Sequence, residues 1–197
     1  MNQISKIIEI IKSNDGYITT KELAHNNINR YYLSVLTKQK KIVRISRGYY
    51  TLENGFSDNF YIILSKSKKA IFSDATALYL HGLSDRNPLV YDVAVPYSSG
   101  NSYKNEKNVN LHYIKKELLD LGLMEMTSPF GMKVRVYNIE RTICDIIKNK
   151  NKMDFEIFVS ALQKYSKLKN KDLNKLMRYA KQLKVDKKTR EYMEVLI

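Results

Sequence analysis

The sequence predicts an α+β protein built in two parts. In the first 40 residues, apolar side chains recur at the three- and four-residue spacing of helices. Between residues 42 and 52 the spacing changes to the alternation of strands. Beyond residue 55 strand-like runs mix with helical ones, and the end of the chain is helical in pattern. These changes of period predict a small helix-and-hairpin part, then a larger mixed α/β part with a helical C-terminus.

The first two helices are short and amphipathic. Residues 4–14 place one stripe of isoleucines on a single side: Ile4, Ile7, Ile8 and Ile11. The run Asn14-Asp15-Gly16 ends this helix, because Asn and Gly tolerate the left-handed conformation of a helix stop. A second, brief helix begins at Thr19-x-x-Glu22, which is a capping box.

A third helix is expected over residues 29–39, after an Asn26-Asn27 turn. Leu33 and Leu36 lie on its apolar side. The opposite side carries polar and aromatic side chains, namely Arg30, Tyr31, Ser34 and Lys38.

Two short strands, residues 42–45 and 49–52, follow the third helix. Gly48 supplies the turn between them and brings Arg44 and Arg47 to the tip of a hairpin. Helices followed by a hairpin in this order predict a winged helix-turn-helix domain over residues 1–55.

Positive charge is concentrated at the two ends of the chain, whose net charge is +14. Residues 1–52 hold nine basic and three acidic side chains, and residues 164–197 hold 11 and four. Residues 53–163 are nearly balanced, with 14 and 13. Residues 29–52 alone carry six Lys or Arg and no Asp or Glu. This uncompensated charge predicts a surface that contacts the phosphate backbone of double-stranded DNA.

The third helix carries the residues expected to read bases. A recognition helix needs hydrogen-bond donors and flat side chains near its N-terminal end to reach base edges in the major groove. Arg30 can pair bidentately with guanine, and Tyr31 can contact phosphate or a thymine methyl group. Ser34 can hydrogen-bond to either.

Four further cations are expected to contact the phosphate backbone of the DNA. Lys38 lies further along the third helix, and Arg44 and Arg47 are wing residues that grip the flanking backbone or reach the minor groove. Lys21, in the first turn of the second helix, is a weaker phosphate candidate, because an ordinary surface lysine explains it equally well.

The domain boundary is expected where residues 53–58 turn to acids and turn-formers, which leaves residues 56–197 as the second domain. The first element predicted in this domain is a helix at residues 74–81, capped by Ser73 and stopped by Gly82. Strands are expected at residues 90–95, 110–114 and 133–137, with a polar loop at residues 97–108. The closing helices are predicted at residues 139–148, 155–165, 173–184 and 189–196.

A second basic surface is expected near the C-terminus. The side opposite the apolar stripe of residues 173–184, together with the residues beyond it, carries Lys171, Lys175, Arg178, Lys187 and Lys188. Contact with DNA or structured RNA is one interpretation. A solvated helix face is the other, and the sequence leaves both open.

Catalytic patterns are weak. His25, His81 and His112 lie at no metal-ligand spacing from each other or from Cys144, so we expect no metal. No glycine-rich phosphate loop is present, and no cofactor is expected. His81 is expected to interact with the dipole at a helix C-terminus. A metal-dependent nuclease could draw on five acids, which capping and surface pairing explain more simply: Asp74, Asp85, Asp92, Glu140 and Asp145. We therefore expect no enzymatic activity.

The single Cys144 excludes an intramolecular disulfide and is typical of a reducing compartment. No apolar run has the length needed to span a bilayer, and the N-terminus alternates polar and apolar residues instead of forming a signal-peptide core. We expect a cytoplasmic protein without a membrane partner.

Several segments, taken together and in this order, resemble the AbiEi family, the antitoxins and transcriptional regulators of abortive-infection (type IV) toxin–antitoxin systems. They are Gly48-Tyr49-Tyr50 after the basic wing, FSDATALYLHGLSDR at residues 72–86, DVAVP at residues 92–96 and YNIERTICD at residues 137–145. Within the last segment, ion pairing among Glu140, Arg141 and Asp145 is expected, since Arg141 and Asp145 are four residues apart on a helix.

The resemblance implies an autorepressor that binds inverted repeats in its own operator, with an antitoxin domain behind it. It also implies a role in phage defence and a cognate toxin that resembles nucleotidyltransferases. Antagonism without a stable toxin complex would suit a basic surface acting on a shared target such as RNA. Two alternatives from other classes are an antitoxin that binds its toxin directly and a metal-dependent nuclease.

Overall fold

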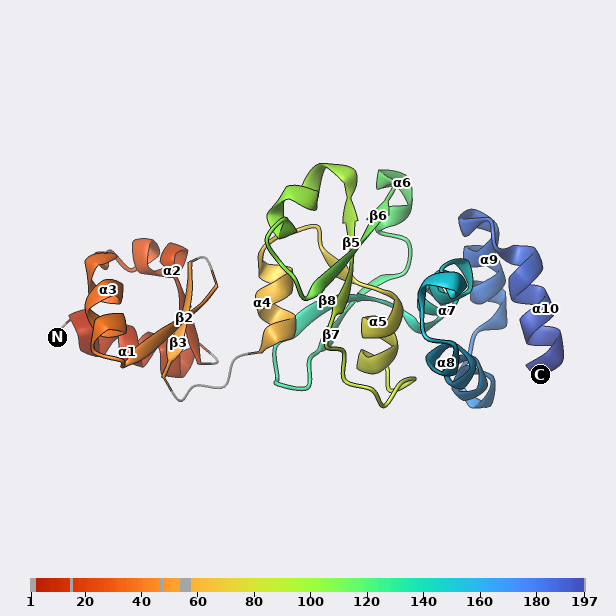
Figure 1. Ribbon diagram of the computed structural model, residues 1–197, viewed down its shortest axis with the longest axis horizontal. Helices are drawn as coiled ribbons and strands as arrows, with labels where there is room; N and C mark the ends of the chain where they lie inside the picture. Colours follow the sequence, from red (N-terminus) through yellow and green to blue (C-terminus); the bar gives the residue numbers. More distant parts are fainter. Residues whose placement is uncertain (1–2, 15, 47, 54–57, 197) are drawn as a thin grey trace. The chain divides into compact units, whose positions relative to one another are not determined.

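The computed structural model describes residues 3–14, 16–46, 48–53 and 58–196, and it confirms a mixed α+β protein (Figure 1). The chain divides into two compact units, Met1–Ile63 with Phe130–Met132, and Leu64–Pro129 with Lys133–Ile197. We call them unit 1 and unit 2. The predicted boundary after residue 55 falls in the segment 54–57, outside the described residues, and stays a prediction.

Unit 1 combines three helices with a three-stranded antiparallel sheet in the order β1-β3-β2. Its elements are α1 (Gln3–Ser13), β1 (Tyr17–Thr19), α2 (Thr20–His25), α3 (Tyr31–Lys38), β2 (Ile42–Ser46) and β3 (Tyr49–Leu52). One core collects the apolar stripe of each helix and one side of the sheet: Ile7, Ile11, Ile18, Leu23, Ile28, Leu33, Leu36 and Ile42. The elements follow the order that the periodicity predicted. A further helix, α4 (Asn59–Ser65), contains the division between the units.

Unit 2 is built on a five-stranded mixed sheet in the order β6-β5-β4-β8-β7. The strands are β4 (Ile71–Phe72), β5 (Tyr91–Pro96), β6 (Val109–Ile114), β7 (Leu123–Thr127) and β8 (Lys133–Tyr137). β5 runs parallel to β6, and β4 runs parallel to β8, while the other two pairings are antiparallel. Helix α5 (Asp74–Leu80) contacts both β5 and the C-terminal helices, so it joins the sheet to them.

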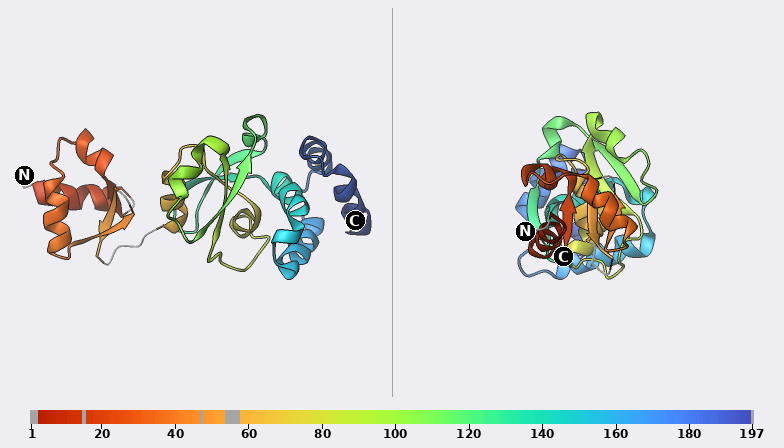
Figure 2. Two further views of the ribbon diagram at one scale, coloured as in Figure 1. Left: turned by 45° about the horizontal axis from the view of Figure 1, so that its top comes forward. Right: turned by 90° about the vertical axis from the view of Figure 1, so that its left-hand side faces the viewer.

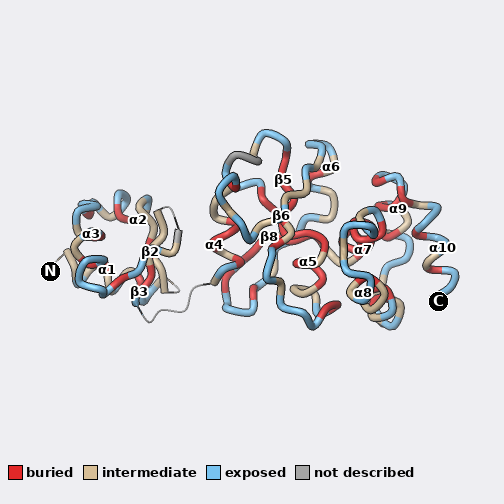
Figure 3. Tube along the Cα trace, in the orientation of Figure 1, coloured by how far each residue is buried: buried red, intermediate tan, exposed pale blue. Residues whose placement is uncertain are grey.

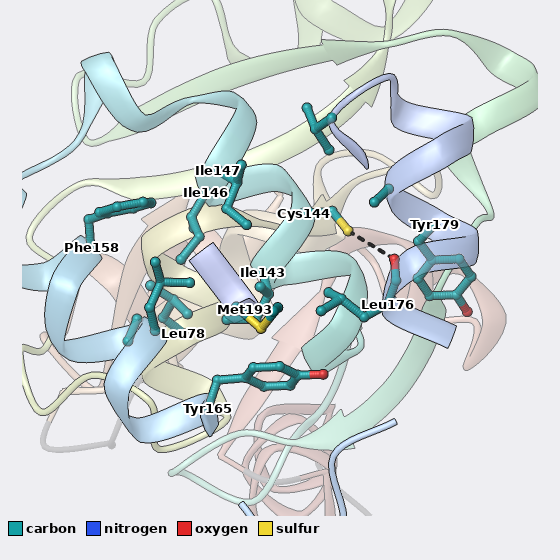
Figure 4. Close-up of a cluster of buried hydrophobic side chains, with 14 of the residues drawn as sticks. Leu78, Ile143, Cys144, Ile146, Ile147, Phe158, Tyr165, Leu176, Tyr179 and Met193 are labelled. Carbon is teal, nitrogen blue, oxygen red and sulfur yellow. Dashed lines mark hydrogen bonds between the residues drawn. The ribbon is translucent and has the colours of Figure 1, made fainter. Parts of the chain in front are cut away.

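The C-terminal helices form a bundle beside the sheet of unit 2 (Figures 1 and 2). They are α7 (Ile139–Lys148), α8 (Phe155–Lys167), α9 (Leu173–Leu183) and α10 (Asp186–Leu196). Helix α7 is buried along almost its whole length, which Figure 3 shows in red. The close-up in Figure 4 shows the core around it, where the Cys144 thiol donates to the Leu176 carbonyl oxygen at 3.6 Å.

Arg141 is the largest fully buried side chain of the described residues. Its Nε donates to both carboxylate oxygens of Asp145, at 3.0 and 2.9 Å, which confirms the expected pair. Its Nη1 donates to the carbonyl oxygens of Leu118 and Leu121, and its guanidinium lies 4.1 Å from the centre of the Tyr137 ring. Glu140 does not join this pair. It binds Lys175 instead, at 2.8 Å, because it faces α9.

Gly122 lets the chain pass close to Arg141. Its backbone has a φ of +78°, and a Cβ there would lie 2.6 Å from the Arg141 Cβ, so no other residue fits without a shift. The turn that contains Gly122 leads into β7.

Several elements differ from the prediction. β7 and β4 were not expected: β7 is an almost entirely exposed edge strand, so it shows no apolar alternation, and β4 is only two residues long. The expected loop 97–108 contains the 3-10 helix η1 (Tyr97–Tyr103). Short helices α6 (Lys116–Leu119) and η2 (Lys150–Lys152) complete unit 2. The last helix begins at Asp186, three residues earlier than expected.

Two predicted roles at the ends of α5 are wrong. Ser73 occupies the N-cap position, but its side chain makes no capping hydrogen bond to the helix. Gly82, with a φ of +71°, does end the helix. His81 does not act as a charged dipole partner, because its Nε2 donates to the Tyr137 carbonyl oxygen at 2.7 Å and burial lowers its pKa.

Candidate nucleic-acid interface

The exposed side of α3 carries the residues predicted to read DNA. Asn29 Oδ1 accepts the Tyr31 amide at 2.9 Å, so the helix begins at Tyr31 and not at residue 29 as expected. Leu33 and Leu36 are buried, which turns the other side of the helix to solvent. The spacing of a helix then aligns Tyr31, Ser34 and Lys38 on that side, and all three are exposed.

Arg30 lies at the N-cap of α3 and is also exposed. Its backbone is already in the right-handed helical region, with φ −59° and ψ −20°. Its neighbour Tyr31 is 67% exposed, and the Tyr32 ring contacts the Tyr31 ring edge-on at 5.9 Å. A guanidinium and a flat ring therefore stand together at the N-terminal end of α3, the end from which a helix in the major groove reaches base edges.

A capping box fixes the start of α2, the helix that precedes α3 in the chain. Thr19 Oγ1 accepts the Glu22 amide at 3.1 Å, and Glu22 Oε2 accepts the Thr19 amide at 2.7 Å, as predicted. Lys21 is exposed in the first turn of α2. Asn27, with a φ of 54°, makes the turn between the two helices, and Ile28 fills the core behind it.

The β2–β3 hairpin presents Arg44 to solvent. Ile42 pairs with Leu52 and is buried, while Arg44 pairs with Tyr50 and is exposed. The register shifts between Arg44 and Ser46, which marks a bulge near the tip. Gly48 has a φ of +85°, and its carbonyl oxygen accepts the Thr20 amide at 2.9 Å, so the hairpin is tied to the start of α2. Arg47 lies outside the described residues, and its wing role stays a prediction.

Three cations of α2 and α3 have no acidic partner among the described residues. Lys21, Arg30 and Lys38 make no salt bridge with any described residue. Glu22 is occupied by Thr19 and Asn14. An interface that binds phosphates needs cations of this kind, exposed and unpaired.

The predicted second basic surface is divided between different environments. Lys171 Nζ donates to the Leu168 carbonyl oxygen at 3.2 Å, and Lys175 is bound to the nearly buried Glu140. The guanidinium of Arg178 lies 5.8 Å from the centre of the Tyr179 ring. Of the five, Lys187 and Lys188, in the first turn of α10, are exposed and make no side-chain hydrogen bond or salt bridge with the described residues.

Unit 2 also brings together two aspartates and a histidine that no sequence pattern connects. His112 Nε2 lies 2.8 Å from Asp92 Oδ1, and His112 Nδ1 lies 3.6 Å from Asp74 Oδ2. Asn110 donates to Asp92, and Asn149 donates to Asp74, both through Nδ2. This Asp74–His112–Asp92 network lines a cavity of about 400 Å³ between α5, β5, β6 and the start of α8. The parallel pairing of β5 with β6 sets Asp92 opposite Asn110 and so diagonally next to His112, and no local pattern could have revealed this contact.

The other acids of the nuclease alternative lie elsewhere. Asp85 is on the surface with Lys164, Glu140 is bound to Lys175, and Asp145 is bound to Arg141. Among the described residues, no three His, Cys, Asp or Glu side chains are placed to hold a metal ion. Within the described residues, the network is therefore a buried cluster of ionisable side chains and not a metal centre.

The network makes the stability of the protein depend on pH. Burial alone would lower the pKa of His112, but the hydrogen bond to Asp92 and the charge of Asp74 outweigh it, and the pKa is raised. A raised pKa contributes stability that is complete below the unfolded value of about 6.5 and is lost as the pH rises through the folded value. We expect His112→Asn to cost roughly 1–2 kcal/mol at pH 6 and less at pH 8.5.

Urea denaturation of both proteins at the two pH values measures this difference. Asp74, Asp92 and Asp145 act on the His112 charge, and all three remain in the variant. A loss of stability that is the same at pH 6 and pH 8.5 would show that folding does not raise the pKa of His112.

None of the helices in the described ranges is both long and apolar enough to cross a membrane.

Residues 5–52 match the family model described as "Transcriptional regulator, AbiEi antitoxin". The match confirms, for this segment, the resemblance seen in the sequence, and the segments at residues 72–86, 92–96 and 137–145 lie outside it. Among solved structures, the RV2827C protein from Mycobacterium tuberculosis is similar, with a TM-score of 0.65 and 13% identity. The similarity covers 91% of this chain and 71% of that chain, and at this identity it shows a shared fold alone. No curated protein matches the chain.

Proposed function

We propose, on the premise that residues 5–52 match a family of AbiEi antitoxins and regulators, that unit 1 is a winged helix-turn-helix that binds operator DNA. In this proposal α2 and α3 form the helix-turn-helix, α3 enters the major groove and the β2–β3 hairpin is the wing. One observation carries it: the exposed side of α3 presents Arg30, Tyr31, Ser34 and Lys38 beside a hairpin, within a segment that has no acidic residue.

The residues divide into two roles. Arg30, Tyr31 and Ser34, at the N-terminal end of α3, supply base contacts and therefore specificity. Phosphate contacts give most of the affinity and come from Lys38, Arg44 and Arg47, with Lys21 at the start of α2 as a further contact.

The family match supports a regulatory antitoxin, and we extend it to a full mechanism. The chain would bind inverted repeats in its own operator in the cytoplasm and repress its operon, which needs no catalysis. Unit 2 would neutralise a cognate toxin, by acting on a shared target such as RNA or by binding the toxin directly. In an abortive-infection system this pairing would protect against phage.

The test is binding of the full-length chain to the DNA upstream of its own gene. Fluorescence anisotropy with this fragment, and with a shuffled fragment of equal length and composition, separates specific from non-specific affinity. We expect preference for the natural fragment by a factor of 10³ or more at physiological salt. Equal affinity for both fragments would contradict the repressor assignment.

Arg30 gives a sharper test of how the sequence is read. Replacing it with Lys keeps the charge but removes the planar fork that pairs with guanine. We expect Arg30→Lys to lose about 1–3 kcal/mol of discrimination between the natural and the shuffled fragment, with little change in binding to the shuffled one. The matched control is Lys12→Arg, an exposed position in the last turn of α1. Intact discrimination in Arg30→Lys would remove Arg30 from the base-reading set.

A further inference from the structure

Four lysines line one hollow of about 580 Å³ in the helical bundle of unit 2. The lysines are Lys148, Lys184, Lys187 and Lys188. All four are exposed, and the apolar part of the lining comes from the buried Leu183 and Val185. We call this the lysine hollow.

Three segments of the bundle build the hollow. Lys148 is the last residue of α7, while Lys184 stands in the tight turn between α9 and α10. The turn closes through the Val185 amide, which donates to the Ala180 carbonyl oxygen at 2.9 Å. Lys184 there has a φ of 60°, a conformation that costs a residue with a side chain roughly 1 kcal/mol. A lysine at this position therefore adds a cation to the hollow at some expense of stability.

The lysines of the hollow outnumber the acids that line it. None of the four lysines makes a salt bridge with any residue that the structure describes. Other lysines of unit 2 do find acids, as Lys66 does with Glu106 and Lys164 with Asp85. The one acid in the lining is Asp186, so the hollow keeps a net charge of +3 from four lysines and one aspartate.

The start of α10 adds backbone donors to these cations. Val185 precedes the helix and has no side-chain oxygen that could cap it. The first amide of α10 with a backbone acceptor is that of Thr189, which donates to the Val185 carbonyl oxygen. The amides of Asp186, Lys187 and Lys188 have no acceptor among the described residues. An uncapped helix N-terminus carries a partial positive charge and points its N–H groups at an anion.

We propose that the lysine hollow binds consecutive phosphate groups, carried either by an RNA backbone or by the polyphosphate chain of a nucleotide. A single phosphate group carries a charge of about −1.5 to −2 and would leave the hollow cationic, so more than one phosphate is needed to neutralise it. The site is distinct from the DNA interface of unit 1. It also differs from the basic surface that the sequence suggested, because Lys148 and Lys184 belong to it and Lys171 and Lys175 do not.

Sodium tripolyphosphate is the probe that tests the site in the full-length chain. Isothermal titration calorimetry should detect its binding at low salt, and the double variant Lys148→Gln/Lys187→Gln should weaken it at least tenfold. The matched control, Lys169→Gln/Lys181→Gln, removes the same charge from two other exposed positions of unit 2 and should leave binding within about twofold. Unchanged melting temperatures show that both variants fold.

Competition then identifies the source of the phosphates. Displacement of tripolyphosphate by a short single-stranded RNA, lost in the hollow variant alone, supports an RNA backbone, and displacement by ATP alone supports a nucleotide. Equal weakening by the hollow and control variants, or no tripolyphosphate binding at millimolar concentration, would overturn the proposal. Operator binding by the hollow variant should equal that of the wild type, so this outcome is independent of the function proposed for unit 1.

Discussion

Replacing Arg141 by Met is expected to destabilise the protein by about 3–5 kcal/mol. Asp145, which is nearly buried, would lose its only cationic hydrogen-bond donor among the described residues. The carbonyl oxygens of Leu118 and Leu121 would lose the Nη1 donor that holds their turn against α7. A buried charge left without its partner keeps its full desolvation cost, and this explains the size of the effect.

The deficit should also depend on pH. Burial raises the pKa of Asp145 to about 7, even with Arg141 beside it. An aspartate with a raised pKa lowers stability as the pH rises from its unfolded value of about 4 through the folded one. Without Arg141 the charged form becomes still less favourable, so the variant should lose less stability at pH 5 than at pH 8.

Equilibrium denaturation in urea, followed by circular dichroism, measures both effects. Arg86→Met is the matched control, because Arg86 pairs with Asp154 and Glu156 on the surface, where a pair contributes about 0–1 kcal/mol. Similar losses for the two variants would mean that the Arg141 contacts contribute no more than a surface pair.

The double variant Lys38→Ala/Arg44→Ala is expected to weaken DNA binding on every sequence and to flatten its salt dependence. Each phosphate contact contributes about 0.9 to the slope of log affinity against log salt concentration. Loss of two contacts should therefore lower the slope by about 2. Both side chains are exposed, so the fold should be unchanged.

Anisotropy titrations between 50 and 200 mM salt give the slope. The control, Lys12→Ala/Lys169→Ala, removes two exposed cations that belong neither to α3 nor to the hairpin and should keep the wild-type slope. A wild-type slope in Lys38→Ala/Arg44→Ala would exclude these residues from the interface.

Co-expression with the toxin adds a second readout, since a variant defective in DNA binding should still protect cells if unit 2 neutralises the toxin.

Local chemistry made much of unit 1 predictable. The capping box of Thr19 and Glu22 and the positive φ of Gly48 depend on contacts within a few residues. The exposed side of α3 follows from the spacing of Leu33 and Leu36 alone. Apolar spacing also predicted α7 with its observed ends. The Asn138 cap and the Arg141–Asp145 pair are likewise local, since each joins residues within one or two helical turns.

Contacts between distant segments could not be predicted in this way. The pairing of β5 with β6 creates the Asp74–His112–Asp92 network, and the packing of α7 against α9 and α10 creates the lysine hollow. For Lys175 the sequence left a nucleic-acid contact and a solvated position open, and the fold pairs it with Glu140 instead. Periodicity records which side of an element is buried, and it carries no information on which other element covers that side.

The amino-acid order alone therefore fixes the class of the fold, most of its helices and strands, and the cationic side of α3, because hydrogen bonds and apolar spacing within about four residues set them. The partners of buried charges, and the gathering of cations from α7, α9 and α10 around one hollow, arise only when segments tens of residues apart pack together. Burial gives those charges their energetic weight, and the packed chain alone provides it.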